Sequence, residues 1–90
     1  MMTQVTLVYQ DVSASVLNNL VSYGFMEQAT KSEYEVRRLR REKSTLILYS
    51  SGKLVVSVPQ PDSASIQRLL SGSIGLTLQS SYSNGNNTSE

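Results

Sequence analysis

The sequence contains no cysteine, no histidine and no tryptophan among its 90 residues. The absence of cysteine excludes disulfide bonds and thiolate metal sites, and the absence of histidine removes the commonest general base and zinc ligand. The seven acidic residues show no recognised catalytic spacing, no glycine-rich phosphate loop is present, and no base is available to activate a serine. We therefore expect a protein that is not an enzyme and that has no metal site and no cofactor.

Charge and long apolar runs are also scarce. Eight Lys and Arg residues against seven Asp and Glu give a net charge of +1, so overall charge provides no argument for nucleic-acid binding. No segment approaches the roughly 20 apolar residues that a membrane span needs. The first ten residues contain no basic region of the kind that begins a signal peptide. These features predict a cytoplasmic protein that does not enter a membrane.

The clearest structural signal is a β-hairpin between residues 44 and 58. Two runs rich in Ile, Leu, Val, Thr and Tyr, at 45–49 and 54–58, flank the turn sequence Ser50-Ser51-Gly52-Lys53. Gly52 can supply the positive φ that a tight turn requires. The turn permits two registers: a two-residue Ser51-Gly52 loop, or a three-residue loop with a bulge at Gly52.

The two registers place the side chains on different faces, because a slip of one residue moves every side chain of a strand to the opposite face of the sheet. The bulged register gives one wholly aliphatic face, formed by Leu46, Leu48, Leu54, Val56 and Val58. Its opposite face is mixed and contains Thr45, Ile47, Tyr49, Val55 and Ser57. The two-residue loop would mix these sets, so we favour the bulged register, which is typical of a sheet with one buried side.

The remaining elements are weaker signals. Alternating apolar residues predict a strand at Gln4–Tyr9, followed by a helix that Asp11 or Ser13 caps and Gly24 ends. We expect a loop at 27–32 and a strand at 33–41, although a short helix is an alternative for the latter. A second helix should begin at Asp62 or Ser63 and end at Gly72, with a possible last strand at 74–78.

This order, β-α-β-β-β-α, predicts a two-layer α+β fold with an antiparallel sheet and two helices on one face. Residues 1–79 should form a single domain. Residues 80–90 are rich in Ser, Asn and Gly and are predicted to be a disordered polar tail.

Five of the eight cationic side chains lie between residues 37 and 43. If this strand turns at Glu42-Lys43, Arg40 lies opposite Thr45 and Arg38 lies opposite Ile47, on the mixed face. Cations next to Thr, Tyr and Val suit the phosphate backbone and the exposed sugars or bases of a nucleic acid. Alternatively, the charges keep an edge strand from aggregating, and the nearby glutamates favour that hypothesis.

The hairpin sequence LILYSSGKLVV, Leu46 to Val56, resembles the hairpin of TATA-binding-protein-like domains, and most of all the N-terminal substrate-binding domain of bacterial ribonuclease HIII. The predicted element order over residues 4–71 is similar too. The resemblance implies that the helix-free face of a curved sheet lies against a nucleic-acid minor groove. The sequence departs from the family at Val58-Pro59, where glycine is frequent, and it has no ribonuclease H domain, so no cleavage is implied.

We therefore predict a non-catalytic nucleic-acid-binding module for DNA, RNA or hybrid, with low sequence specificity. Its predicted site residues are Arg38, Arg40, Thr45, Ile47, Tyr49, Lys53, Val55 and Ser57. The alternative is a small protein-interaction or dimerisation subunit, similar to that of the tRNA-modifying KEOPS complex. A homodimer of this kind would bury Ile47, Tyr49 and Val55.

Overall fold

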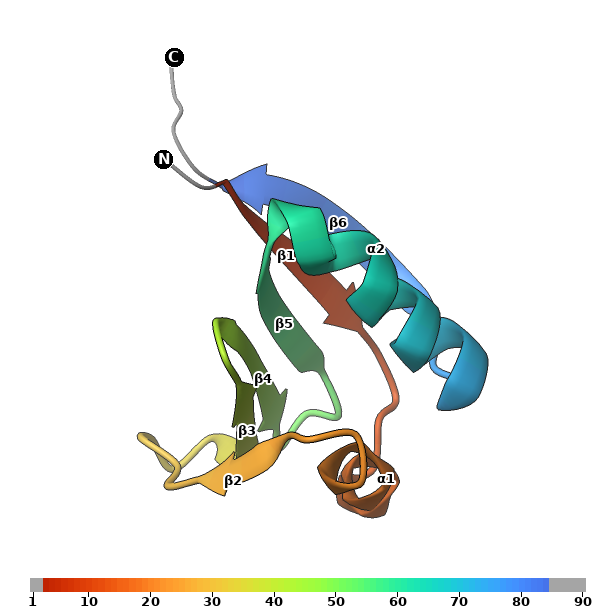
Figure 1. The fold of residues 1–90 in the computed structure, drawn as a ribbon. Coiled ribbons are helices and arrows are strands. Elements are labelled where there is room, and N and C mark those ends of the chain that lie inside the picture. The colour runs from red at the N-terminus through yellow and green to blue at the C-terminus, as the bar shows by residue number, and fades with distance from the viewer. Residues whose placement is uncertain (1–2, 85–90) are drawn as a thin grey trace.

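The computed structural model describes residues 3–84, which form a six-stranded antiparallel sheet with two helical segments (Figure 1). The sheet order is β2-β3-β4-β5-β1-β6. The strands are β1 (Gln4–Tyr9), β2 (Met26–Gln28), β3 (Glu35–Arg41), β4 (Ser44–Tyr49), β5 (Leu54–Pro59) and β6 (Leu78–Asn84). The general α+β prediction is confirmed, but the predicted order lacks two of these strands.

The β4–β5 hairpin has the bulged register. Leu46 lies opposite Val56 and Leu48 lies opposite Leu54, and all four side chains are buried. The Tyr49 N–H donates to the Lys53 carbonyl, and the Gly52 N–H donates to the Tyr49 carbonyl, both at 2.9 Å. Gly52 has φ +91°, which side-chain-bearing residues rarely adopt. The bulge prediction is therefore confirmed.

The β3 strand prediction is also confirmed, with a start at Glu35 instead of residue 33. Glu42 and Lys43 form a two-residue turn between β3 and β4, and Glu42 has φ +54° at its first position. Such a positive φ matches the twist of the flanking strands. Arg40 lies opposite Thr45 and Arg38 opposite Ile47, as predicted.

The first helical segment is shorter than predicted. It consists of a 3-10 turn, η1 (Ala14–Leu17), and one α-helical turn, α1 (Asn18–Val21). The prediction of a side-chain cap is wrong, because Ser13 occupies the N-cap position without capping and Asp11 adopts φ +59° before the helix begins. The chain leaves α1 through Gly24 at φ +96°, as the sequence indicated.

The second helix, α2 (Gln60–Arg68), continues as a π-helical turn, η2 (Leu69–Ser73). It begins earlier than predicted, with Pro59 as the N-cap and Pro61 in the first turn. Backbone N–H groups of the first turn have no acceptor within the helix, so proline, which lacks an N–H, is tolerated there. Asp62 is thus a first-turn residue that favours the helix dipole, and the cap prediction at Asp62 or Ser63 is wrong. No helix within residues 3–84 is long and apolar enough to cross a membrane.

Two strands arise where the sequence predicted none. β2 overlaps the start of the predicted loop at 27–32, and β6 begins at Leu78, where the predicted strand at 74–78 should end. β6 pairs with β1, from Val8 opposite Ser80 to Gln4 opposite Asn84. The prediction of a disordered tail from Ser80 is therefore wrong for residues 80–84, and its remainder, 85–90, lies outside the described residues. The physical reason is that β6 pairs with the side of β1 that would otherwise form an edge of the sheet.

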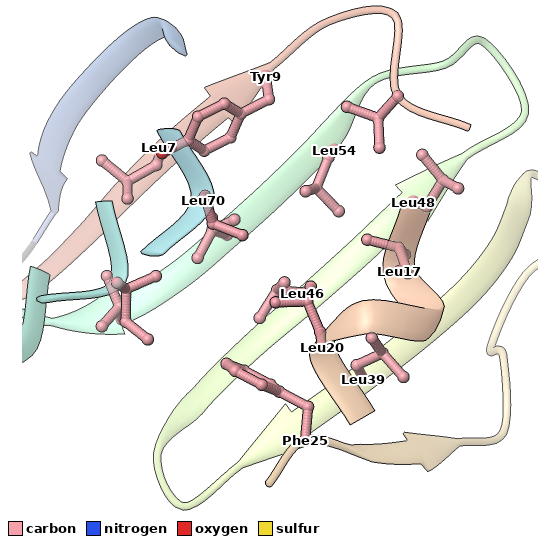
Figure 2. Packing of buried hydrophobic residues seen from close by; sticks show 14 residues of the cluster. Leu7, Tyr9, Leu17, Leu20, Phe25, Leu39, Leu46, Leu48, Leu54 and Leu70 are labelled. Carbon is pink, nitrogen blue, oxygen red and sulfur yellow. The ribbon is translucent and has the colours of Figure 1, made fainter. Parts of the chain in front are cut away.

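One hydrophobic core lies between the helical segments and one face of the sheet. Leu17 and Leu20 lie close to Leu39 and Leu46, while Leu70 lies over the β1–β5 side (Figure 2). The fully buried aromatic residues of this core are Tyr9 and Phe25. Because both helical segments contribute to the same cluster, the opposite face of the sheet is left without a helix among the described residues.

Candidate nucleic-acid interface

The helix-free face is built from alternate residues of the strands. One row runs across four strands, with Arg38 opposite Ile47, Ile47 opposite Val55, and Val55 opposite Val8. The next row aligns Arg40, Thr45, Ser57 and Thr6 in the same way. The strand pairing therefore brings together Arg38, Arg40, Thr45, Ile47, Val55 and Ser57 from the predicted site.

The centre of this face is apolar and closely packed. Val8 is only 7% exposed, and in the sheet it lies between Val55 of β5 and Ser80 of β6. Ile47, Tyr49 and Val55 are half-buried. The surface therefore presents partly accessible apolar groups within a polar and charged surround.

Arg38 is less available than the sequence suggested. Its guanidinium forms a two-point ion pair with Glu35, Nε to Oε1 at 3.1 Å and Nη2 to Oε2 at 3.2 Å. The hydrogen bonds from Arg38 lower the pKa of the Glu35 carboxyl below its usual range. The Glu35 carboxylate therefore compensates the charge of Arg38. Nη1 is the guanidinium nitrogen that takes no part in this pair.

Arg40 and Lys53 are the more accessible cations of the predicted site. The Arg40 Nε donates to the Glu42 carbonyl at 3.0 Å, and within residues 3–84 its guanidinium forms no ion pair. Lys53 is exposed and lies apart from Arg40, at the tip of the β4–β5 hairpin. A guanidinium held by one neutral acceptor retains its full charge for an anionic partner.

A small cavity of about 180 Å³ marks the β2–β3 side of this face. It is lined by Gln28, Ala29, Lys31, Arg38, Arg40 and Thr45. Three of these belong to the predicted site, whereas Lys31 and Gln28 were missed. No sequence signal pointed to them, because strand β2 and the segment that follows it were predicted as a loop. Lys31 adds a third accessible cation beside Arg40.

The other two arginines of the basic run lie on the helix side of the sheet. Arg37 donates to the Ala14 carbonyl and to Asn18 Oδ1, both at 2.8 Å, and forms an ion pair with Glu27. The hydrogen bonds that Arg37 donates to Glu27 lower the pKa of the Glu27 carboxyl. Arg41 donates to the Tyr23 carbonyl at 2.8 Å and lies over the Phe25 ring, 4.6 Å from its centroid. The basic run is therefore divided between two faces.

Residues 3–84 contain no group of three or more acidic side chains that could hold a metal ion. What the surface offers is hydrogen-bond donors, positive charge and half-buried apolar groups.

No protein-family model matches this chain, and neither a curated protein nor a solved structure is significantly similar to it. The resemblance to TATA-binding-protein-like domains thus rests on the hairpin sequence and on the element order predicted from the sequence.

Proposed function

We propose that this protein is a non-catalytic nucleic-acid-binding module that uses the helix-free face of its sheet, as a TATA-binding-protein-like domain would. The observation that carries the proposal is the cross-strand row of Arg38, Ile47 and Val55. Arg40 lies in the neighbouring row, and Lys31 lines the same small cavity as both arginines. A surface of this composition can meet sugars or bases at its centre and phosphates at its rim.

The individual residues have different parts in this proposal. Arg40, Lys31 and Lys53 contact phosphate oxygens, and Arg38 contributes its unpaired Nη1. Tyr49, Ile47 and Val55 contact sugars or bases, and the hydroxyls of Thr45 and Ser57 add neutral hydrogen bonds. None of these groups is arranged to read a base edge with two donors or acceptors, so we expect little sequence preference.

The small number of cations sets the expected affinity. With three or four phosphate contacts, binding should be weak, and log K should fall with log salt at a slope of about −2 to −4.

The test measures fluorescence anisotropy of labelled duplex DNA, RNA–DNA hybrid and single strands at low salt. Arg40→Ala should weaken binding and make the slope shallower by about 1, because one phosphate contact is lost. The matched control is Arg68→Ala, which removes the same charge from an exposed position on α2, in the helix layer. Absence of binding to every probe, or an equal loss in both variants, would refute the proposal.

A protein partner is the second candidate, and the Arg38–Glu35 pair favours it by reducing the positive charge of this face. A homodimer, or a subunit interface of the kind found in the KEOPS complex, would bury Ile47, Tyr49 and Val55. Sedimentation with and without oligonucleotide separates the two candidates: concentration-dependent dimers without nucleic acid support this one.

A further inference from the structure

The tip of the β4–β5 hairpin lies beside the segment that enters β3. The Ser50 N–H donates to the Tyr34 carbonyl at 2.9 Å, and Glu35 lies opposite Tyr49 at the end of the ladder. These contacts hold Tyr34 next to the hairpin, although it is far from the hairpin turn in sequence.

A cavity of about 400 Å³ opens at this junction. It is lined by Tyr34, Tyr49, Ser50, Ser51 and Lys53. This volume is within the range of small-molecule sites, about 300–1,000 Å³. Two tyrosines, two serines and one lysine therefore line one hollow at the edge of the helix-free face.

Tyr34 is unusually accessible for an aromatic residue, with 64% of its surface exposed. It does not belong to the hydrophobic core, so its ring is not needed to stabilise the fold. Tyr49, in contrast, is half-buried, and the hydrogen bond from its N–H to the Lys53 carbonyl fixes its backbone. The hollow thus combines one half-buried tyrosine with one largely exposed tyrosine.

We propose that this hollow binds a single unpaired nucleobase, so that the protein prefers single-stranded nucleic acid to duplex. This inference rests on the proposed function and specifies its substrate. A base that stacks on Tyr34 and Tyr49 offers its flat face, which all bases have, while Lys53 contacts the adjacent phosphate. The hydroxyls of Ser50 and Ser51 can bond to base edges. Bases within a duplex are already stacked and paired, so they could enter only after extrusion.

The test compares a short oligothymidylate with a duplex of mixed sequence, by anisotropy at low salt. The wild-type protein should bind the single strand more tightly. Tyr34→Ala should weaken single-strand binding about tenfold without changing duplex binding or the salt slope, because stacking does not involve counterion release. Tyr34→Phe should retain single-strand binding, since it keeps the ring.

A second variant tests the phosphate contact. Lys53→Ala should weaken single-strand binding and reduce the salt slope by slightly less than 1. Equal affinity for the two probes, together with no effect of Tyr34→Ala, would overturn the base-binding inference. If binding then still depended on Arg40, the proposed function would remain supported. Absence of binding to both probes would overturn both.

Discussion

The arginines of β3 have two different roles, which depend on the face of the sheet on which each side chain lies. Arg38 and Arg40 point to the helix-free face, whereas Arg37 and Arg41 lie on the side of the buried Leu39. Arg37 is the more connected of the helix-side pair, because it joins β2, through Glu27, to η1 and α1. It therefore stabilises the position of the first helical segment on the sheet.

Replacing Arg37 should accordingly affect the fold and not the binding. We expect Arg37→Ala to lower the free energy of unfolding by about 1–2 kcal/mol, since hydrogen bonds to the Ala14 carbonyl and Asn18 are lost together with a partly exposed ion pair. Urea denaturation measures the change. Arg40→Ala is the control, with an expected change below about 0.5 kcal/mol. Equal effects of the two variants would contradict the division of roles.

Gly52 is a second position where a single residue determines the local structure. A Cβ at this position would meet Asp11 Cα at 3.7 Å, which is an ordinary contact, so space does not require glycine. The backbone does, because φ is +91°. Gly52→Ala and Gly52→Val should each destabilise the protein by about 1–3 kcal/mol, with the larger loss for the β-branched residue.

Gly72 provides a matched control for this prediction. Its φ is not positive, and a Cβ there would meet nothing within 4 Å. Gly72→Ala should be neutral or slightly stabilising, because alanine restricts the unfolded chain. Thermal unfolding of both alanine variants measures the difference, and a loss at Gly72 as large as that at Gly52 would contradict the role given to φ.

At the scale of elements, β6 makes the largest difference to the sheet. It covers the edge of β1, from Tyr9 opposite Leu78 to Gln4 opposite Asn84. A chain that ends at Gln79 loses most of these pairs and leaves one side of β1 without its ladder. We expect its melting temperature to fall by more than about 5 °C, which corresponds to roughly 1 kcal/mol for a domain of this size.

A chain that ends at Asn84 is the control, because it keeps every described pair between β1 and β6. Its melting temperature should lie close to that of the full chain. If the chain that ends at Gln79 melts at the same temperature as this control, β6 does not contribute to stability.

The elements that could be predicted from the sequence are those with a hydrophobic period of two and a distinctive turn. The β4–β5 hairpin and its bulge followed from the sorting of leucines and valines and from Gly52. β2 and β6 could not be predicted in this way, since MEQ and LQSSYSN have no apolar alternation. Their strand structure comes from pairing with a neighbour, which overrides local propensity.

The candidate site shows the same limit. The register of β3 and β4 was enough to place Arg38, Arg40, Thr45 and Ile47 on one face. The ion pair between Arg38 and Glu35 depends on the irregular pairing between Glu35 and Arg37, which the sequence did not indicate. Lys31 and Tyr34 were missed because each belongs to an irregular segment whose position is set by tertiary contacts.

At the scale of the whole molecule, the place of β1 in the sheet has a consequence for folding during synthesis. β1 is made before both of its neighbours: Gln4 pairs with Pro59 in β5 and with Asn84 in β6. Each of the strands β2 to β5 pairs with its neighbour in sequence, so these pairs can form locally as the strands emerge from the ribosome. Closing the long loops to β1 costs more entropy and comes later. In the nascent chain, β1 therefore has no strand partner, and Leu7 and Tyr9 have no neighbour in β5, until β5 has been made.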